Sequence, residues 1–223
     1  RVVGGGTQWL ADLSVNDAVD LIGPLGNRFE LPVDKSIGLL VGGGVGLPPM
    51  FYLAESLHRA GWYAVAFVGA LTRDLLAITF DADAAPSVDG QPVSCVKEFY
   101  KYGYPTVVTT DDGSYGLRGQ ITAGLDRFLE SQSPLEAAKT VIYTCGPDRM
   151  MHAVATLARK HHLAPLIAGG GRQADTVLAL DQLGHFNFGG VEPTWARRTL
   201  ETIVTENRLA MRDIVAVVDY HTG

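Results

Sequence analysis

A glycine-rich turn between an apolar run and an amphipathic segment most constrains the fold of this chain. Residues 37–41 (IGLLV) are short, apolar and bounded by turn residues, a pattern typical of a buried parallel strand. Gly42, Gly43, Gly44 and Gly46 follow. Apolar residues then recur at helical spacing, namely Met50, Leu53, Ala54 and Leu57. The order predicts a strand, a tight turn and a helix.

This turn has the features of a nucleotide-binding turn. Glycines without a Cβ let a ligand approach the backbone closely, and the N-terminus of the following helix favours a pyrophosphate. Pro48 or Pro49 suits the first helical turn, where no N–H is needed. The spacing departs from G-x-G-x-x-G because Leu47 or Pro49 takes the third glycine position, and no Walker lysine follows. A tight strand-to-helix connection without a ligand remains the alternative.

A second turn of the same kind occurs later in the chain. Residues 140–144 (TVIYT) are again strand-like, and Cys145, Gly146 and Pro147 lead into a helix that carries Met150 and runs to about His161. In open parallel sheets ligands bind outside the carboxyl ends of the strands. We therefore expect both turns to line one crevice.

A third strand, at residues 106–109, ends in a polar turn. Asp111, Asp112, Gly113 and Ser114 form this turn, and a helix is predicted to begin near Ile121. Its carboxylates and hydroxyl can contact a ribose or a nicotinamide amide. An Asp-Asp-Gly turn is also common at strand ends for structural reasons alone.

Composition excludes several classes of function. With 223 residues, 47% of them hydrophobic and 19% charged, the chain is long enough to bury a core. A formal net charge of −6 without a Lys/Arg block argues against nucleic acid or an anionic membrane as partner. No apolar stretch approaches the roughly 20 residues of a membrane span, and no signal-peptide pattern is present. We therefore expect a cytoplasmic protein.

The cysteines and adjacent histidines do not indicate a metal site. Cys95 and Cys145 form no C-x-x-C pair, so neither a zinc site nor a disulfide framework is expected, and Cys95 is predicted to be a buried thiol. His161 and His162 follow a helix, but adjacent side chains on a helix diverge. They are expected to provide favourable charge at the helix C-terminus.

The elements together predict an α/β fold with an open parallel sheet flanked by helices. A further apolar strand is predicted at residues 62–68, and an exposed loop at residues 81–92. Three parts are expected: residues 1–33 as a barrel end and linker, 34–165 as a nucleotide-binding domain, and 166–223 as a tail. A helix at residues 194–209 and a strand at 214–219 would let the tail complete the sheet.

The motifs, taken in order, resemble those of the ferredoxin reductase superfamily, most closely the electron-transfer subunits of class 1B dihydroorotate dehydrogenases of pyrimidine synthesis. The resemblance covers approximately residues 1–165. Besides the three turns, it rests on residues 2–10 (VVGGGTQWL) and 21–29 (LIGPLGNRF), which resemble the end of the family's flavin-binding barrel and its link into the nicotinamide domain.

The resemblance implies two dinucleotide cofactors and a protein partner. FAD would contact Gly6 and Thr7, NAD would bind through the turn from Gly42 to Gly46, and Cys145 would lie near both rings as a positioning contact. Hydride would pass between the nicotinamide C4 and the flavin N5 without an acid or base from the protein. The family's [2Fe-2S] cluster passes electrons on to the dihydroorotate dehydrogenase catalytic subunit.

Three departures leave alternatives open. The family's first flavin motif is absent before residue 1, so the FAD site is expected to be incomplete, and no cysteine follows Cys145 to bind a cluster. The segment after the second strand carries Arg73 and no acidic residue at the usual ribose position, so NADP stays possible. The alternative functions are a stand-alone reductase acting on NAD(P)H and a non-catalytic nucleotide-binding remnant.

Overall fold

The computed structural model describes residues 2, 4–19, 29–163 and 165–167. The chain divides into two compact units, one of Arg1–Asn27 with Leu183–His221 and one of Arg28–Gln182 with Thr222–Gly223, and each is described by itself. The elements expected at residues 194–209 and 214–219 lie outside the described residues, as do residues 20–28 of the expected barrel end.

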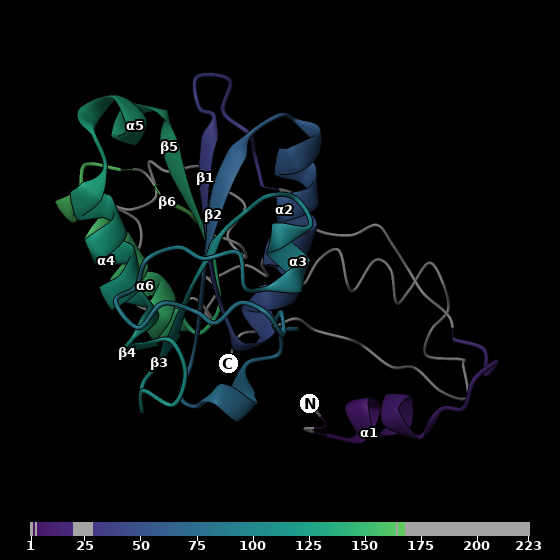
Figure 1. Ribbon diagram of the computed structural model, residues 1–223. Helices are drawn as coiled ribbons and strands as arrows, with labels where there is room; N and C mark the ends of the chain where they lie inside the picture. The colour runs from purple at the N-terminus through teal and green to yellow at the C-terminus, as the bar shows by residue number, and fades with distance from the viewer. Residues whose placement is uncertain (1, 3, 20–28, 164, 168–223) are drawn as a thin grey trace, which may run out of the picture. The chain divides into compact units, whose positions relative to one another are not determined.

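A six-stranded parallel sheet forms the centre of the larger unit (Figure 1). Its strands lie in the order β4-β3-β2-β1-β5-β6, and every neighbouring pair is parallel. The strands are β1 (Ile37–Gly43), β2 (Tyr63–Ala70), β3 (Thr106–Thr110), β4 (Leu117–Arg118), β5 (Thr140–Cys145) and β6 (Pro165–Ile167).

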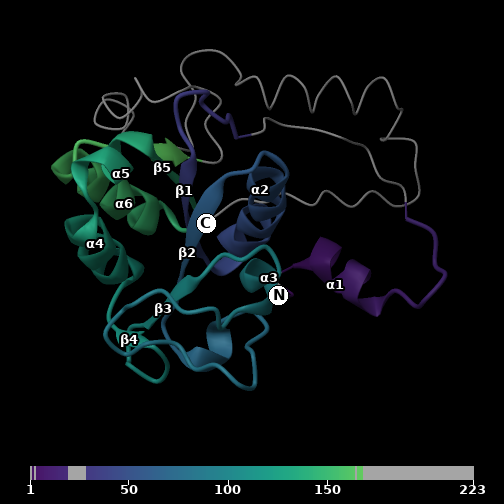
Figure 2. The ribbon, with the colours of Figure 1, turned by 45° about the horizontal axis from the view of Figure 1, so that its top comes forward.

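Helices cover both faces of this sheet, which gives three layers (Figure 2). The α2 helix (Leu47–Arg59) and the short α3 helix (Lys97–Tyr100) lie on one face, while α4 (Ile121–Ser131) and α6 (Asp148–Lys160) lie on the other. Between α4 and β5 the chain forms α5 (Pro134–Lys139), which begins at a capping box between Ser133 and Glu136. The predicted α/β class with an open parallel sheet is confirmed.

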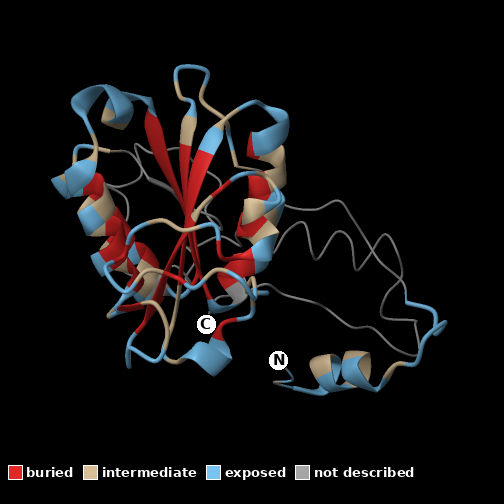
Figure 3. Cartoon of the chain, in the orientation of Figure 1, coloured by how far each residue is buried: buried red, intermediate tan, exposed pale blue. Residues whose placement is uncertain are grey.

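The core consists of two apolar clusters separated by the sheet (Figure 3). Side chains alternate along each strand, so Leu40 of β1 packs toward α2 while Leu39 and Val41 pack toward α4 and α6. Four predicted core residues of α2 are indeed buried, namely Met50, Leu53, Ala54 and Leu57. The helical spacing therefore identified the correct face of α2.

The linker that precedes β1 is fixed to the core of the larger unit. Phe29 packs edge-to-face against Tyr143 of β5 with ring centroids 5.3 Å apart. The Tyr143 hydroxyl donates a hydrogen bond of 2.9 Å to the backbone carbonyl of Glu30, and burial raises the pKa of Tyr143. These contacts anchor Phe29, at the end of the G-P-L-G-N-R-F motif, and the following Glu30 to the sheet.

The described residues of the smaller unit form a helix rather than strands. The α1 helix (Gly5–Asp12) begins at Gly4, whose backbone N–H donates to the Thr7 hydroxyl while that hydroxyl donates to the Gly4 carbonyl. Barrel strands expected between residues 4 and 19 are therefore not found there. Over the described ranges, no helix is long and apolar enough to cross a membrane.

The four long predicted strands are confirmed with small shifts in their ends. The first continues through Gly43, because Gly42 and Gly43 still pair with Val68 and Gly69 of β2. Short elements were missed: α3, β4, α5 and β6 have from two to six residues. Residues 81–92 are irregular as predicted, although Pro86 and Gly90 are buried.

Candidate functional site

The sheet reverses its order of connection between β1 and β5, and this position defines the candidate site. From β1 the chain enters α2 on one face, whereas from the neighbouring β5 it enters α6 on the other face. The two connections diverge at the carboxyl ends of these strands, which is where open parallel sheets bind their ligands. The glycine turn and the Cys145 turn meet at this position.

The glycine turn leaves its backbone open to a ligand. Gly42 and Gly43 complete β1, and the short 3-10 helix η1 (Gly44–Gly46) leads into α2. Gly44 has a φ of +55° and is exposed, and a Cβ built on it would meet no atom within 4 Å. Only glycine adopts this conformation without strain, and the missing side chain keeps the turn accessible.

The N-terminus of α2 lies beside this turn but offers few backbone donors, because the Leu47 N–H donates to the Gly44 carbonyl and Pro48 and Pro49 have no N–H. No side chain caps the helix, and a proline lies in its first turn. The aligned peptide dipoles of the helix still give its start a partial positive charge. The start of α2 is therefore suited to bind an anionic group such as a pyrophosphate.

Cys145 ends β5 as a buried thiol. Its side chain is 7% exposed and packs in the cluster under α2, and burial raises the pKa of Cys145. The thiol is therefore neutral near pH 7, which disfavours a role as a nucleophile. Cys95 is also buried, as predicted.

Residues after Cys145 bring the second turn against the first. Pro147 precedes α6, and Met150 in the first turn of α6 lies beside both glycine turns. A Cβ built on Gly43 would lie 2.8 Å from the Met150 sulfur, and one built on Gly146 would lie 2.5 Å from its terminal methyl. The structure thus brings Gly43, Gly146, Pro147 and Met150 together.

The third turn lies beside the end of β2. The backbone N–H of Asp111 donates to the carbonyl of Ala70 at 3.1 Å, and that of Asp112 donates to the carbonyl of Leu71 at 3.2 Å. The Asp112 carboxylate accepts the backbone N–H of Ser114 at 2.9 Å, an Asx-turn that Gly113 completes with a φ of +77°. Hydrogen bonds from Ser114 hold the pKa of Asp112 below its usual value.

An open hollow of about 490 Å³ lies between the segments that follow β2 and β3. Its lining combines polar residues of both segments with apolar residues of the first segment. The lining consists of Thr72, Arg73, Asp74, Leu76, Ile78, Phe80, Asp112 and Ser114. Sequence reasoning singled out Arg73, Asp112 and Ser114 but missed the others, which only the spatial pairing of the two segments brings together.

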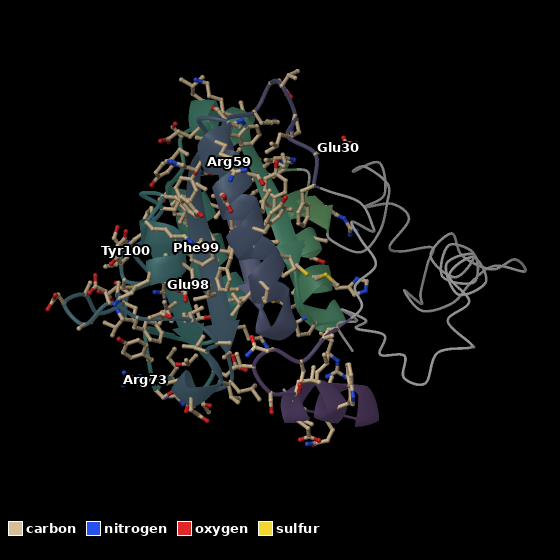
Figure 4. The ribbon with its side chains drawn as sticks, turned by 90° about the vertical axis from the view of Figure 1, so that its right-hand side faces the viewer. Glu30, Arg59, Arg73, Glu98, Phe99 and Tyr100 are labelled. Carbon is tan, nitrogen blue, oxygen red and sulfur yellow. The ribbon has the colours of Figure 1, made fainter. Side chains whose placement is uncertain are left out.

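The apolar side of the hollow is held in place by α3. Both carboxylate oxygens of Glu98 accept the backbone N–H of Thr79, at 2.9 and 3.1 Å, and Phe80 pairs with Val96 in a β-bridge. In Figure 4, Arg59 of α2 and Arg73 lie toward opposite ends of the domain, and Glu98 and Phe99 of α3 lie between them. The lining residues of the hollow follow the last residues of β2 and β3. The hollow therefore lies at the carboxyl edge of the sheet.

Two predicted cofactor contacts belong to the other unit. Gly6 and Thr7 lie in the first turn of α1, in the smaller unit. Across residues 2, 4–19, 29–163 and 165–167, no group of three or more His, Cys, Asp or Glu side chains is arranged to bind a metal ion. His161 instead contacts Asp126 of α4 at 2.7 Å.

Comparison with curated proteins identifies relatives of one kind. The chain is 39% identical over 159 residues to the electron transfer subunit of dihydroorotate dehydrogenase B (NAD(+)) of Geobacillus kaustophilus, covering 70% of this chain and 51% of that protein. The subunit of the same name from Streptococcus pneumoniae is 32% identical over 153 residues, covering 68% of this chain and 50% of that protein. The chain thus spans about half the length of the curated relatives it matches. No family model matches it.

Comparison with solved structures finds a protein of similar fold. An NADH-dependent reduced ferredoxin-NADP oxidoreductase superposes with a TM-score of 0.57 at 27% identity, covering 77% of this chain and 56% of that one. The match in fold therefore accompanies a match in sequence. The chain is thus similar in sequence to dihydroorotate dehydrogenase B electron-transfer subunits over about half of their length, and similar in fold to a ferredoxin-NADP oxidoreductase.

Proposed function

We propose that the described domain binds NAD(H) for flavin-linked electron transfer, as part of the electron-transfer subunit of a dihydroorotate dehydrogenase in pyrimidine biosynthesis. The observation that carries this proposal is the meeting of the glycine turn and the Cys145 turn at the reversal point between β1 and β5. The curated relatives, whose printed name includes NAD(+), support the assignment.

The residues present fit a nicotinamide dinucleotide. The exposed turn at Gly44 and the uncapped start of α2 suit the pyrophosphate. On one side of this turn lies Gly146 near Met150, and on the other side lies the hollow beside Arg73 and Asp112. In the strand order β3-β2-β1-β5 the turns that end these strands follow one another, an order that suits a ligand of two nucleotides joined by a pyrophosphate.

The chain's residues differ in their fit to the other cofactors of the family. For FAD, Gly6 and Thr7 stay proposed contacts. A [2Fe-2S] cluster takes four ligands, usually thiolates, and this chain has two cysteines, Cys95 before α3 and Cys145 at the end of β5. The residues of this chain therefore do not provide that cluster. Bound NADH would supply a hydride to a flavin, and the protein would hold the two rings in register.

An absorbance spectrum tests the proposal first. We would record 300–600 nm spectra of the purified chain with added FAD after gel filtration, before and after adding NADH. Retained flavin bands that bleach with NADH would support electron transfer by this chain. Binding of NADH without retained flavin would support the alternative of a nucleotide-binding module, and failure to bind NADH would refute both.

A binding experiment separates the pyrimidine role from a stand-alone reductase. The catalytic subunit of a dihydroorotate dehydrogenase from one of the relatives would be immobilised and the chain passed over it. Saturable binding supports the subunit role. Electron transfer from NADH to flavin without such binding would favour the stand-alone reductase, which shares the fold and the nucleotide site.

Cys145 is proposed as a positioning contact for the nicotinamide ring rather than a nucleophile. Its raised pKa and its place at the end of β5 support this role. Cys145→Ala should lower the rate of flavin reduction at saturating NADH, with little change in NADH affinity. Cys95→Ala removes a buried thiol away from the crevice as a control. An unchanged rate in Cys145→Ala would refute the proposed contact.

A further inference from the structure

The hydroxyl group of Thr110 closes the turn that follows β3. Thr110 is the last residue of this strand and is fully buried. Its hydroxyl accepts the backbone N–H of Tyr115 at 3.0 Å and donates to the backbone carbonyl of the same residue at 2.9 Å. One side chain thus pairs both backbone groups of a residue five positions later in the chain. These bonds take the place of the ladder bonds that a turn lacks, and they hold the turn in one conformation.

The residues at the end of this turn contact the segment after β2. The backbone N–H of Arg73 donates to the Ser114 hydroxyl at 2.9 Å, and the guanidinium carbon of Arg73 lies 4.3 Å from the centre of the Tyr115 ring. Tyr115 also packs edge-to-face on Phe80, with ring centroids 4.7 Å apart. Arg73, Phe80 and Ser114 all line the hollow between the two segments. The shape of the hollow therefore depends on where the turn places Ser114 and Tyr115.

Another threonine of the same strand shows what is particular to Thr110. Thr106, the first residue of β3, is also fully buried, but among the described residues its hydroxyl has no hydrogen-bond partner. Threonine is favoured in strands whatever its hydroxyl contacts, so the strand alone accounts for Thr106. The hydroxyl of Thr110 is instead used both as donor and as acceptor within the turn. Its role therefore belongs to the turn rather than to the strand.

We infer that Thr110 is a positioning residue for the adenosine half of a bound dinucleotide, and that it acts through Ser114 and Tyr115. This inference rests on the proposed function, in which the pyrophosphate binds at the glycine turn after β1. The Cys145 turn receives the nicotinamide half, which leaves the adenosine half for the hollow. Thr110 is fully buried and does not itself contact the ligand. Without its hydroxyl the turn is no longer held, so the ligand must order the turn on binding, and that cost lowers affinity.

Thr110→Val tests the inference on the full chain, because valine keeps the branched shape and removes the hydroxyl. Calorimetry would measure the affinities for NADH, for 5′-AMP, which contains only the adenosine half, and for nicotinamide mononucleotide, which contains only the other half. We expect Thr110→Val to bind NADH and 5′-AMP about five- to tenfold more weakly, and nicotinamide mononucleotide unchanged. Thr110→Ser keeps a hydroxyl that can form the same two hydrogen bonds, so it should restore the affinity for 5′-AMP.

Thr106→Val is the matched control. It makes the same chemical change in the same strand, at a buried hydroxyl without a partner among the described residues, and it should leave all three affinities unchanged. Thr110→Cys replaces the hydroxyl with a thiol that hydrogen-bonds only weakly. It should also bind 5′-AMP more weakly than Thr110→Ser does, which keeps the test available should Thr110→Val not fold.

The two halves of the ligand separate positioning from a general effect on the fold. Equal affinity for 5′-AMP in the wild-type chain and in both Thr110→Val and Thr110→Cys would overturn the inference while the proposed function stands. An equal loss of affinity for 5′-AMP and for nicotinamide mononucleotide would also overturn it, because the hydroxyl would then support the fold as a whole. Failure of the wild-type chain to bind any of the three ligands would overturn the inference and the proposed function together.

Discussion

The carbonyl oxygen of Cys145 lies so close to Gly46 that a Cβ at Gly46 would be 2.0 Å from it. Gly46 therefore lacks a side chain because the β5 turn packs directly on the start of α2. Gly44 is different, since its missing side chain faces open space. One glycine of the turn thus serves packing between the two turns, and the other keeps the turn accessible.

Gly46→Ala should destabilise the domain by about 2 kcal/mol. The added methyl group must displace backbone, and overpacking of this kind typically costs 1–3 kcal/mol. Urea unfolding followed by circular dichroism would measure the loss, and NADH affinity should fall with it because the turn moves. Gly5→Ala is the control, since a Cβ there meets no atom within 4 Å. An unchanged midpoint in Gly46→Ala would show that the two turns are not in contact.

Tyr143→Phe should cost about 1 kcal/mol of unfolding free energy. The change removes the hydrogen bond to the Glu30 carbonyl and keeps the ring that packs on Phe29, and a neutral hydrogen bond contributes about this much. Tyr52→Phe, at a side chain 74% exposed, should change nothing. Faster proteolysis of the linker in Tyr143→Phe would confirm that the bond anchors it, and equal stability of both variants would contradict this role.

Most of the sheet could be predicted because buried parallel strands read as short apolar runs. Residues 37–41 and 62–68 are examples, and their alternating sides follow from the strand period. The strand β4 has only two residues, Leu117 and Arg118, which is too short to show any pattern. Its pairing with Thr109 and Thr110 depends on the fold around it.

The glycine turn could be predicted for a similar reason, and the hollow could not. A strand, glycines and a helix are consecutive in sequence, so the turn after β1 is a local feature. The hollow requires the Arg73 segment to meet Ser114, which lies 41 residues later. Nothing in either segment alone specifies that contact. The apolar side of the hollow, formed by Leu76, Ile78 and Phe80, likewise depends on α3, a helix that sequence reasoning missed.

Asp126→Asn should weaken the packing of α4 on α6 by roughly 0.5–1 kcal/mol at pH 7. Asp126 accepts hydrogen bonds from Lys160 at 2.9 Å and contacts His161 at 2.7 Å. These contacts, with His161 the larger cause, lower the pKa of Asp126. A lowered folded-state pKa adds stability that is present above about pH 4 and is lost as the pH falls further.

The pH dependence separates this contact from a general effect of substitution. The difference in unfolding free energy between the wild-type chain and Asp126→Asn should shrink when urea titrations at pH 7 are repeated at pH 3. Asp34→Asn is the control, because the Asp34 carboxylate is largely exposed and lies 3.9 Å from the Lys35 ammonium, at the long end for an ion pair. Its stability difference from the wild-type chain should not change with pH in this way. A difference that stays constant with pH would mean that the charge of Asp126 does not matter.

The buried thiol of Cys95 should make the domain sensitive to alkaline pH. Burial raises the pKa of Cys95 from its ordinary value of 9.0 to about 11, because ionisation would place a charge in the cluster that contains Val96 and Phe99. The unfolded chain therefore loses this proton at lower pH than the folded one. Stability from the neutral thiol is complete below pH 9 and is lost as the pH rises toward 11. Urea midpoints measured from pH 8 to pH 11 should fall more steeply for the wild-type chain than for Cys95→Ala, and parallel curves would show that Cys95 does not titrate with unfolding.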